Sequence, residues 1–256
     1  MRFKSLGSGS TGNASIVKST GTRPCHLLID CGFGLKSLLA KLEAAGLTAD
    51  DLDAIFITHE HGDHIGCAQA LSARYRIPLW MSAGTATAAG FEQTSTLLQF
   101  ATDGQAIDFG GLQITPFTVP HDAREPLQLS CTDGQVKLGV LTDLGHATAH
   151  VISHLENCDA LILECNHDAD LLAQSSYPTF LKQRVEGSYG HLSNGQAANI
   201  ARAVGHARLG HVVAAHLSQQ NNRPELVAAC LANALARSLN DIVIASAADG
   251  CAWLEV

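Results

Sequence analysis

Short apolar runs separated by polar, glycine-containing stretches dominate the first third of the chain. The length of these runs and their glycine boundaries predict buried strands. Between them, 35–46 and 65–75 carry apolar residues at helical spacing, and the first of these stretches ends at a glycine. The predicted strands are 26–32, 53–61 and 77–82, and the glycine-rich stretch 6–13 is predicted as a turn between two further strands.

The middle of the chain is rich in strand-like runs, and the last third is richer in helices. Blocks of strands with helices between and after them favour two mixed sheets packed face to face, with helices outside. No low-complexity tract and no long linker interrupts the pattern, so we predict a single domain over 1–256. The strand-like runs are 105–122 with its Gly-Gly turn, 135–145, 159–166, 211–218, 241–247 and 251–256, and the helical ones are 177–187, 193–205 and 224–239.

The composition narrows the class of protein. With 16 Lys and Arg against 24 Asp and Glu, the formal net charge is −8, which argues against a protein that coats nucleic acid through bulk positive charge. A nuclease remains compatible with this charge, because bound divalent metals and a local basic patch attract phosphate.

Nothing in the sequence predicts secretion or a membrane. The N-terminus has no apolar signal-peptide core, and no apolar run is long enough to span a bilayer. We therefore expect a cytoplasmic protein, in which the eight scattered cysteines stay reduced and mostly buried.

The stretch 58–67, THEHGDHIGC, follows a predicted buried strand and holds four side chains that bind metals. In an extended segment His59 and His61 point to the same side, because successive side chains alternate. Asp63 and His64 follow at the next turn and can face a neighbouring position. Because one metal needs only three or four protein ligands, the cluster suggests two metals that share one cleft.

Three further candidates each stand at the end of an apolar strand: His121, Asp143 and His216. Together with the loop they make five histidines and two aspartates. This set suits two metals about 4 Å apart with a bridging carboxylate. Nitrogen and oxygen ligands fit zinc, and also manganese or iron.

H-x-H-x-D-H followed by isolated His, Asp and His at strand ends resembles the metallo-β-lactamase superfamily over essentially the whole chain. The resemblance implies an α/β (α+β) fold, a four-layer αββα sandwich with two divalent metals at one edge of the sheets. It also implies a metal-bridging hydroxide as nucleophile, because metals lower the pKa of bound water. The implied ligands are His59, His61 and His121 for one metal and Asp63, His64 and His216 for the other, with Asp143 bridging.

Further stretches are similar to one branch of the superfamily, the YycJ (WalJ) family. They are SLGSGSTGNAS near the start, VPHDAREP around His121, ECNHD at 164–168, GHLSNGQAANIA around His191 and AAHLSQQNN around His216. That family resembles ribonuclease Z and the phosphodiesterase PhnP. The resemblance implies a 5′-to-3′ exonuclease that acts on DNA ends, with repair proteins as partners.

His191 stands directly before a predicted helix, for which Ser193 or Asn194 is the N-cap candidate. A helix N-terminus offers free N–H groups and partial positive charge, which suit a phosphate. His191 is a catalytic candidate because a histidine there can protonate the leaving oxygen; the alternative is that it only caps the helix. Asp63 is a second catalytic candidate, since it can orient the nucleophile besides binding metal.

Most of the other substrate-binding candidates have a structural alternative, which is a solvated helix face for the two basic residues and a tight turn for the residues within 6–13. They are Lys182 and Arg184 for a nucleic-acid backbone, Ser8, Ser10 or Asn13 for a terminal phosphate, and His167, which the family resemblance places in the cleft or at a phosphate. The histidines left without a role are His26, His146, His150, His154, His206 and His211.

Several functions stay open for such a site. A dinuclear-metal phosphodiesterase that degrades DNA from its 5′ end is the leading hypothesis. The alternatives are a small-molecule (cyclic) phosphodiesterase of PhnP type, a glyoxalase II-like thioester or lactone hydrolase, and a nucleic-acid end-binding module with structural metals. A basic groove with a 5′-phosphate pocket favours the exonuclease, and a small closed pocket favours the small-molecule enzyme. The sequence does not fix the oligomeric state.

Overall fold

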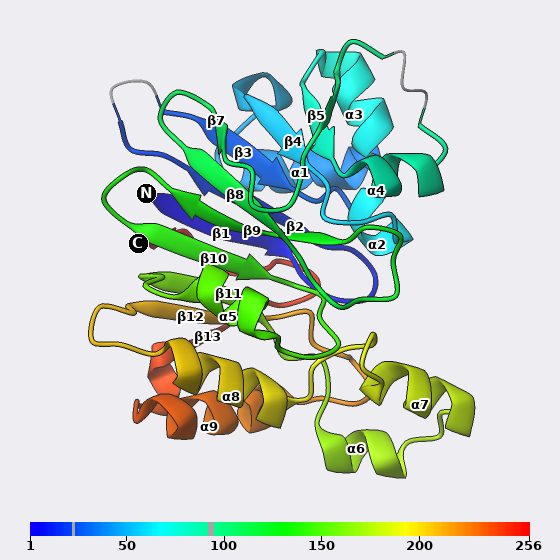
Figure 1. The fold of residues 1–256 in the computed structure, drawn as a ribbon, viewed down its shortest axis with the longest axis vertical. Coiled ribbons are helices and arrows are strands. Elements are labelled where there is room, and N and C mark those ends of the chain that lie inside the picture. Colours follow the sequence, from blue (N-terminus) through cyan, green and yellow to red (C-terminus); the bar gives the residue numbers. More distant parts are fainter. Residues whose placement is uncertain (22–23, 92–94) are drawn as a thin grey trace.

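The computed structural model describes residues 1–21, 24–91 and 95–256, whose strands form two sheets (Figure 1). The strands of the first sheet are, in spatial order, β14 (Leu254–Glu255), β1 (Arg2–Gly7), β2 (Ala14–Lys18), β3 (His26–Ile29), β4 (Ala54–Phe56), β5 (Leu79–Met81) and β6 (Leu98–Phe100). Those of the second sheet are β13 (Ile242–Ile244), β12 (His211–Ala215), β11 (Ala160–Glu164), β10 (Lys137–Leu141), β9 (Leu127–Thr132), β8 (Gln113–Thr118) and β7 (Ile107–Asp108).

Both sheets combine parallel and antiparallel pairs, as the alternation of strands and helices predicts. In the first sheet β3, β4, β5 and β6 run parallel, whereas β14, β1, β2 and β3 pair antiparallel. In the second sheet β10 to β13 run parallel and β7 to β10 pair antiparallel. Parallel neighbours need a crossover, and helices supply most of these connections.

Helices cover the outer face of each sheet, so the layers run helix, sheet, sheet, helix (Figure 1). This order confirms the predicted αββα sandwich. The first sheet carries α1 (Leu35–Ala44), α3 (Ala68–Tyr75) and α4 (Ala83–Ala88), and the second carries α5 (Ala149–Leu155), α8 (Asn194–Val204) and α9 (Pro224–Leu235). The shorter or peripheral helices are α2 (Gly62–Ile65), α6 (Ala169–Gln174), α7 (Thr179–Glu186), η1 (Ala49–Asp51) and η2 (Leu239–Asp241).

The central core lies between the inner faces of the two sheets. Phe3 and Leu27 of the first sheet belong to the same fully buried cluster as Leu129, Val140 and Val213 of the second. Burying apolar surface on both inner faces is the main favourable term that holds such layers together. Because the sheets share this core, we propose that residues 1–256 form a single domain.

The structure differs from the predicted elements at several boundaries. The stretch 65–75 is not one helix, because Gly66 separates α2 from α3 with a φ of +26°. A Cβ atom on Gly66 would lie 2.3 Å from the Cys31 carbonyl oxygen, so only glycine permits this close approach. Helix α9 ends at Leu235 rather than at 239, since Ala236 adopts the left-handed conformation.

Strand β9 was not predicted, because polar residues interrupt its apolar pattern. Gln128 is nevertheless fully buried, and its side chain pairs with the backbone N–H and the hydroxyl of Thr142. The helices α4, α5 and α6 were also missed. Each is too short to show a clear helical period.

Candidate metal centre

The candidate ligands gather at one edge of the sandwich, where strands of both sheets end. His59 follows β4, His121 follows β8, Asp143 follows β10 and His216 follows β12. Parallel strands present their carboxyl ends at the same edge, which is where open α/β sheets bind ligands. The short helix α2 and its N-cap His61 supply the remaining candidates at this edge, away from both chain termini (Figure 1).

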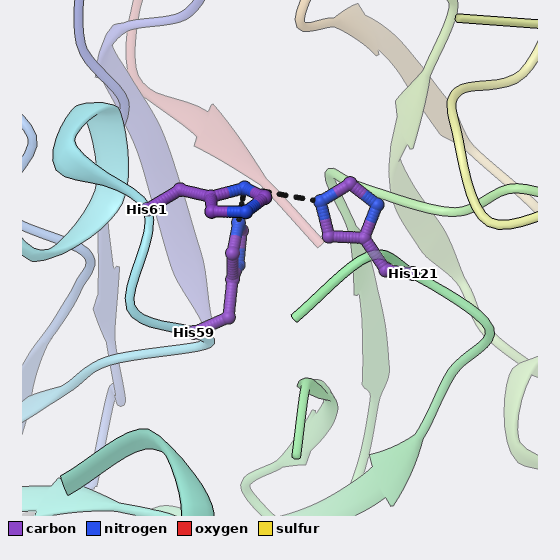
Figure 2. A group of neighbouring side chains, drawn as sticks. All are labelled: His59, His61 and His121. Carbon is purple, nitrogen blue, oxygen red and sulfur yellow. Dashed lines mark hydrogen bonds between the residues drawn. The ribbon is translucent and has the colours of Figure 1, made fainter. Parts of the chain in front are cut away.

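Three imidazoles converge on one point, as Figure 2 shows. His59 Nε2 lies 3.1 Å from His61 Nδ1, and His121 Nε2 lies 3.3 Å from the same atom. The rings of His59 and His61 stand edge to face with centroids 4.6 Å apart, so the H-x-H pair does share one side of the chain. Three nitrogen ligands on one point match what a catalytic zinc takes from a protein.

A second group of ligand atoms lies beside the first. Asp63 Oδ2 is 3.7 Å from His64 Nε2 and 3.4 Å from His216 Nε2. Asp143 stands between the groups, with Oδ2 at 2.9 Å from His64 Nε2 and Oδ1 at 3.8 Å from His121 Nε2. One carboxylate thus contacts both sets, which is the placement that a bridging ligand needs.

Most of these rings are held through Nδ1, so that Nε2 faces the centre. His64 Nδ1 donates to Asp30 Oδ2 at 2.7 Å, His121 Nδ1 to the Gly190 carbonyl at 3.1 Å, and His216 Nδ1 to the Thr142 carbonyl at 3.0 Å. These acceptors carry no proton of their own, so the hydrogen must sit on Nδ1. Such partners fix the orientation of metal-binding histidines.

Some ligand atoms are buried without a hydrogen bond, and this shows whether a cation fits the centre. Within the described part of the chain, Asp143 Oδ2 and His216 Nε2 are buried and have no hydrogen bond, although other ligand atoms lie near them. A buried polar atom without a partner costs free energy. Divalent cations satisfy both kinds of atom at once, so the donor set fits metal binding.

The protonation of these groups depends on their mutual charge. Burial lowers the pKa of His64, but the carboxylates of Asp143 and Asp30 outweigh burial and raise this pKa to about 10. Burial raises the pKa of Asp143, but His216 and His64 outweigh it and hold this pKa well below its usual value. Burial lowers the pKa of His59 well below its usual value, and His64 adds to this shift. The carboxylates therefore stay charged and attract a cation.

His191 lies next to the centre and is held by a carboxylate that the sequence analysis did not assign. Its Nδ1 lies 2.6 Å from Glu164 Oε1 and 3.4 Å from Asp143 Oδ1. Glu164 is fully buried, and its other oxygen accepts the backbone N–H groups of Leu144 and Leu192. Burial lowers the pKa of His191, but Glu164 outweighs burial and raises this pKa above its usual value. Glu164 thus orients His191 and favours its protonated form.

A cleft of about 370 Å³ opens over the centre and is lined by Asp63, Asp143, His191, His216 and Ser10, among others. Its far wall comes from α7, which contributes Leu181, Arg184 and Val185. The Arg184 guanidinium pairs with Asp122 at 2.8 Å, and Asp122 in turn lies 3.8 Å from His61 Nε2.

Two exposed aromatic residues are sequence neighbours of residues that line this cleft. Phe180, on α7, is 72% exposed and precedes the lining residue Leu181, and Tyr189 is 63% exposed and precedes the lining residue Gly190. Helix α7 buries none of its own side chains and stands away from the two sheets (Figure 1). Neither aromatic stands out in the sequence, because a helical pattern does not reveal which side chains remain uncovered.

Two of the predicted phosphate-binding residues lie behind the ligands rather than in the open cleft. Ser8 is buried, and its hydroxyl accepts the backbone N–H of His216. Asn13 is buried too, and its Nδ2 lies 3.1 Å from His64 Nε2 and 3.3 Å from the Asp63 carbonyl oxygen. Both side chains therefore hold ligand-bearing segments in place, and their contact with a substrate stays a prediction.

The remaining predicted substrate contacts lie around the N-terminus of α8 and on α7. Ser193 is the N-cap of α8, as expected, and accepts the Gln196 N–H. Asn194 is buried in a reciprocal amide pair with Asn222, and Lys182 donates to the Ala173 carbonyl. His167 is buried beside Ser193, and its Nδ1 has no hydrogen bond within the described residues. The structure brings none of these four side chains to the cleft lining.

Asp30 and Glu164 were not assigned a role from the sequence, although their positions indicate one. Each is a charged residue at the end of an apolar strand run, the same pattern that identified Asp143. An uncompensated carboxylate at such a position is costly, so it indicates a polar partner nearby. Here the partners are His64 and His191.

The four-layer fold and this buried donor set define a metal-dependent hydrolase, and comparison with known proteins agrees. A family model described as a Beta-lactamase superfamily domain matches residues 26–216. The chain is 33% identical to exodeoxyribonuclease YycJ from Bacillus anthracis, over 88% of this chain and 86% of that protein. It is 32% identical to exodeoxyribonuclease WalJ from Streptococcus pneumoniae R6, over 93% of this chain and 89% of that protein. The chain therefore belongs to the β-lactamase superfamily and, within it, to the family of YycJ and WalJ.

Solved structures share the fold at lower identity. The metallo-β-lactamase fold protein YhfI from Bacillus subtilis superposes with a TM-score of 0.77 at 22% identity, covering 99% of each chain. Human tRNase Z, short form, gives 0.68 at 18% identity, covering 100% of this chain and 99% of that one. At this level of identity the likeness shows the fold alone.

Proposed function

We propose that this protein is a dinuclear-metal-dependent phosphodiesterase that degrades DNA from the 5′ end. The observation that carries the proposal is the pair of ligand groups on either side of Asp143, with His191 beside them in an open cleft. Two metals that share a carboxylate are suited to displacement at phosphorus. The name exodeoxyribonuclease, borne by relatives at 32–33% identity over most of the chain, supports DNA as the substrate.

The donor groups divide between two divalent ions, zinc or manganese, with iron also compatible with the ligand set. When bound, the metals would neutralise the scissile phosphate and lower the pKa of the attacking water. The ligands would be His59, His61 and His121 for one ion and Asp63, His64 and His216 for the other, with Asp143 shared.

The chain's own residues supply the remaining steps of hydrolysis. Glu164 holds Nδ1 of His191, which leaves the other ring nitrogen for a proton transfer to the leaving oxygen. Asp63 faces the cleft and can orient the attacking water besides binding metal. Arg184, at the cleft wall, is placed to meet a phosphate when its pairing with Asp122 opens.

The test follows degradation of 5′-phosphorylated duplex DNA labelled at either end, with zinc or manganese supplied. A His59→Ala, Asp63→Ala double variant removes one ligand from each group, and His211→Ala serves as a matched histidine control. We expect stepwise loss from the 5′ end in the wild type and the control, and none in the double variant. DNA left intact by the wild type, or degraded equally by the double variant, would refute the proposal.

A second candidate is hydrolysis of a small cyclic phosphodiester, and the size of the cleft favours it. A volume of about 370 Å³ lies within the range of small-molecule sites. Turnover of bis-p-nitrophenyl phosphate and of cyclic nucleotides, with DNA left intact, would identify this activity. A kcat/KM for DNA far above that for cyclic nucleotides would exclude it as the main function.

A further inference from the structure

Two histidines without a role in the metal centre lie one turn apart on α5. Val151 and Leu155 pack this helix against the core. His150 and His154 directly precede these two residues in sequence, so they lie on the adjoining face of the helix. Residues four apart on a helix are neighbours, and the two imidazole centroids are 4.6 Å apart. Both rings are reachable by solvent, because His150 is exposed and His154 is half-buried.

Asp103, in the loop between β6 and β7, completes the group from a distant part of the sequence. Its Oδ1 lies 2.8 Å from His150 Nε2 and also accepts the Thr118 N–H at 2.7 Å. The three side chains each offer one ligand atom, and these atoms all lie within 4.8 Å of one another. Two segments of the chain, α5 and the β6–β7 loop, therefore supply the ligand atoms of one small, solvent-accessible cluster.

The cluster is held in place before any ligand arrives. The His154 ring stacks on the buried Phe117 ring, with centroids 4.9 Å apart and planes within 14°. Asp103 is fixed by the backbone of Thr118 at the end of β8. Less side-chain freedom is then lost on binding, which favours affinity.

We propose that His150, His154 and Asp103 form a second, surface site for a divalent transition metal, with zinc as the best match. Two imidazoles and a carboxylate are ligands that zinc takes, and water would complete the coordination. A histidine pair at i and i+4 on one helix is a known arrangement for binding zinc. The site shares no ligand with the metal centre and does not rest on the proposed phosphodiesterase activity.

A metal held there would link α5 to the β6–β7 loop, in which Asp103 is already bonded to Thr118 at the end of β8. Strand β8 leads directly to His121, so the ion would fix the base of a segment that carries a candidate ligand of the metal centre. Binding to the folded state alone also stabilises it by mass action. The expected role is therefore to clamp this corner of the second sheet.

The experiment measures bound zinc per full-length chain after equilibrium dialysis against buffered free zinc. His150→Ala and His154→Ala should each bind one zinc ion fewer than the wild type, whereas His211→Ala, which belongs to no candidate cluster among the described residues, should keep the full number. Equal zinc content in the wild type and His150→Ala would overturn the proposal.

Asp103→Asn gives a gentler test, because asparagine can still accept the Thr118 N–H and so preserve the loop. Losing even an outer partner of a metal ligand costs roughly 10–100-fold in affinity, so we expect at least about tenfold weaker zinc binding at this site. Zinc-dependent shifts of the His150 and His154 imidazole NMR signals report the site directly. Absence of these shifts in the wild type would contradict it.

Discussion

At the scale of single residues, metal binding at the centre depends on which ring nitrogen, Nδ1 or Nε2, each histidine directs toward it. Asp30 and the carbonyls of Thr142 and Gly190 occupy Nδ1 of His64, His216 and His121. Each ring is thereby limited to Nε2 as its metal-facing atom. This selection of tautomer and orientation is a property of the partners rather than of the histidines.

The role of His191 can be isolated by the choice of leaving group. If His191 protonates the leaving oxygen, His191→Ala should lower kcat on DNA by about 100-fold or more, because a sugar alkoxide is a poor leaving group. Bis-p-nitrophenyl phosphate should be affected far less, since p-nitrophenolate leaves without a proton. Steady-state kinetics on both substrates measure this difference, with His206→Ala as control. Equal losses on both substrates would assign His191 a positioning role instead.

The cysteines allow a test that is independent of activity. All eight are free, and Cys31 and Cys165 are fully buried, where burial raises the pKa of both thiols well above its usual value. Burial also raises the pKa of Cys25 to about 12 and that of Cys158 to about 11. Because the thiolate is the reactive form and each raised pKa keeps the thiol protonated, iodoacetamide at pH 8 should leave these four unmodified until the protein unfolds. Rapid modification of Cys31 or Cys165 in the native protein, read by mass spectrometry, would contradict the structure.

At the scale of elements, short connections carry the chemistry and regular elements position them. The loop after β3 and helix α2 approach so closely that a Cβ on Gly32 would lie 1.7 Å from the Asp63 carbonyl oxygen. The Asn13 N–H donates to that same oxygen at 2.8 Å. The loop after β3 and the segment at Asn13 thus hold the α2 backbone that presents Asp63 and His64.

Gly32→Ala should therefore displace the ligand loop while leaving the sheets intact. The added methyl group cannot fit against the Asp63 backbone, so we expect weaker metal binding and a loss of stability of about 1–3 kcal/mol, typical of overpacking. Metal content and denaturant unfolding measure the two effects. Gly34→Ala is the matched control, because nothing lies within 4 Å of a Cβ at Gly34. Wild-type metal content in Gly32→Ala would show that the loop tolerates the shift.

Helix α7 offers the clearest test of a polymeric substrate. Stacking of a base on an exposed aromatic contributes about 1–3 kcal/mol, so Phe180→Ala and Tyr189→Ala should each raise KM for DNA by roughly tenfold. Turnover of a small phosphodiester without aromatic rings should not change, because it has no ring to stack. Phe100→Ala, which removes an exposed aromatic from strand β6, is the control. Unchanged KM for DNA in both variants would exclude stacking at this rim.

At the scale of the whole molecule, a chain with a net charge of −8 concentrates buried acidic groups at one edge. Phosphate is not attracted to such a surface without added positive charge, so the proposed function predicts that metals are needed for substrate binding as well as for chemistry. None of the helices in the described ranges has the length and apolar character needed to cross a bilayer. The cytoplasmic location stays a prediction.

Metal removal should lower the stability of the entire fold. The centre joins strand ends of both sheets, and a ligand that binds only the folded state at 1,000 times its Kd contributes about 4 kcal/mol. Chelation should therefore lower Tm, and zinc or manganese should restore it. The measurement is made on His150→Ala, so that the proposed site on α5 does not contribute. A Tm that chelation leaves unchanged would show that the centre does not hold a stabilising metal.

The sequence by itself determined the fold class and the identity of the candidate ligands. Strand and helix periods along the chain are local, and H-x-H-x-D-H is a local motif, so both can be read without knowing the fold. His121, Asp143 and His216 were identifiable because polar residues at the ends of apolar strands stand out against their surroundings. The sequence also limited the N-cap of α8 to Ser193 or Asn194, and the structure has Ser193 in this position.

Only the tertiary structure decided which groups meet across the sheets. Glu164 pairs with His191 and Asp30 with His64, each over more than twenty positions of sequence, and no local pattern specifies such a pair. The same holds for Asp103 beside His150, and for the burial of Ser8 and Asn13 behind the ligands. Burial and long-range contact depend on how the layers pack. A side chain's role is therefore fixed by its partners in space, which packing selects and local sequence does not.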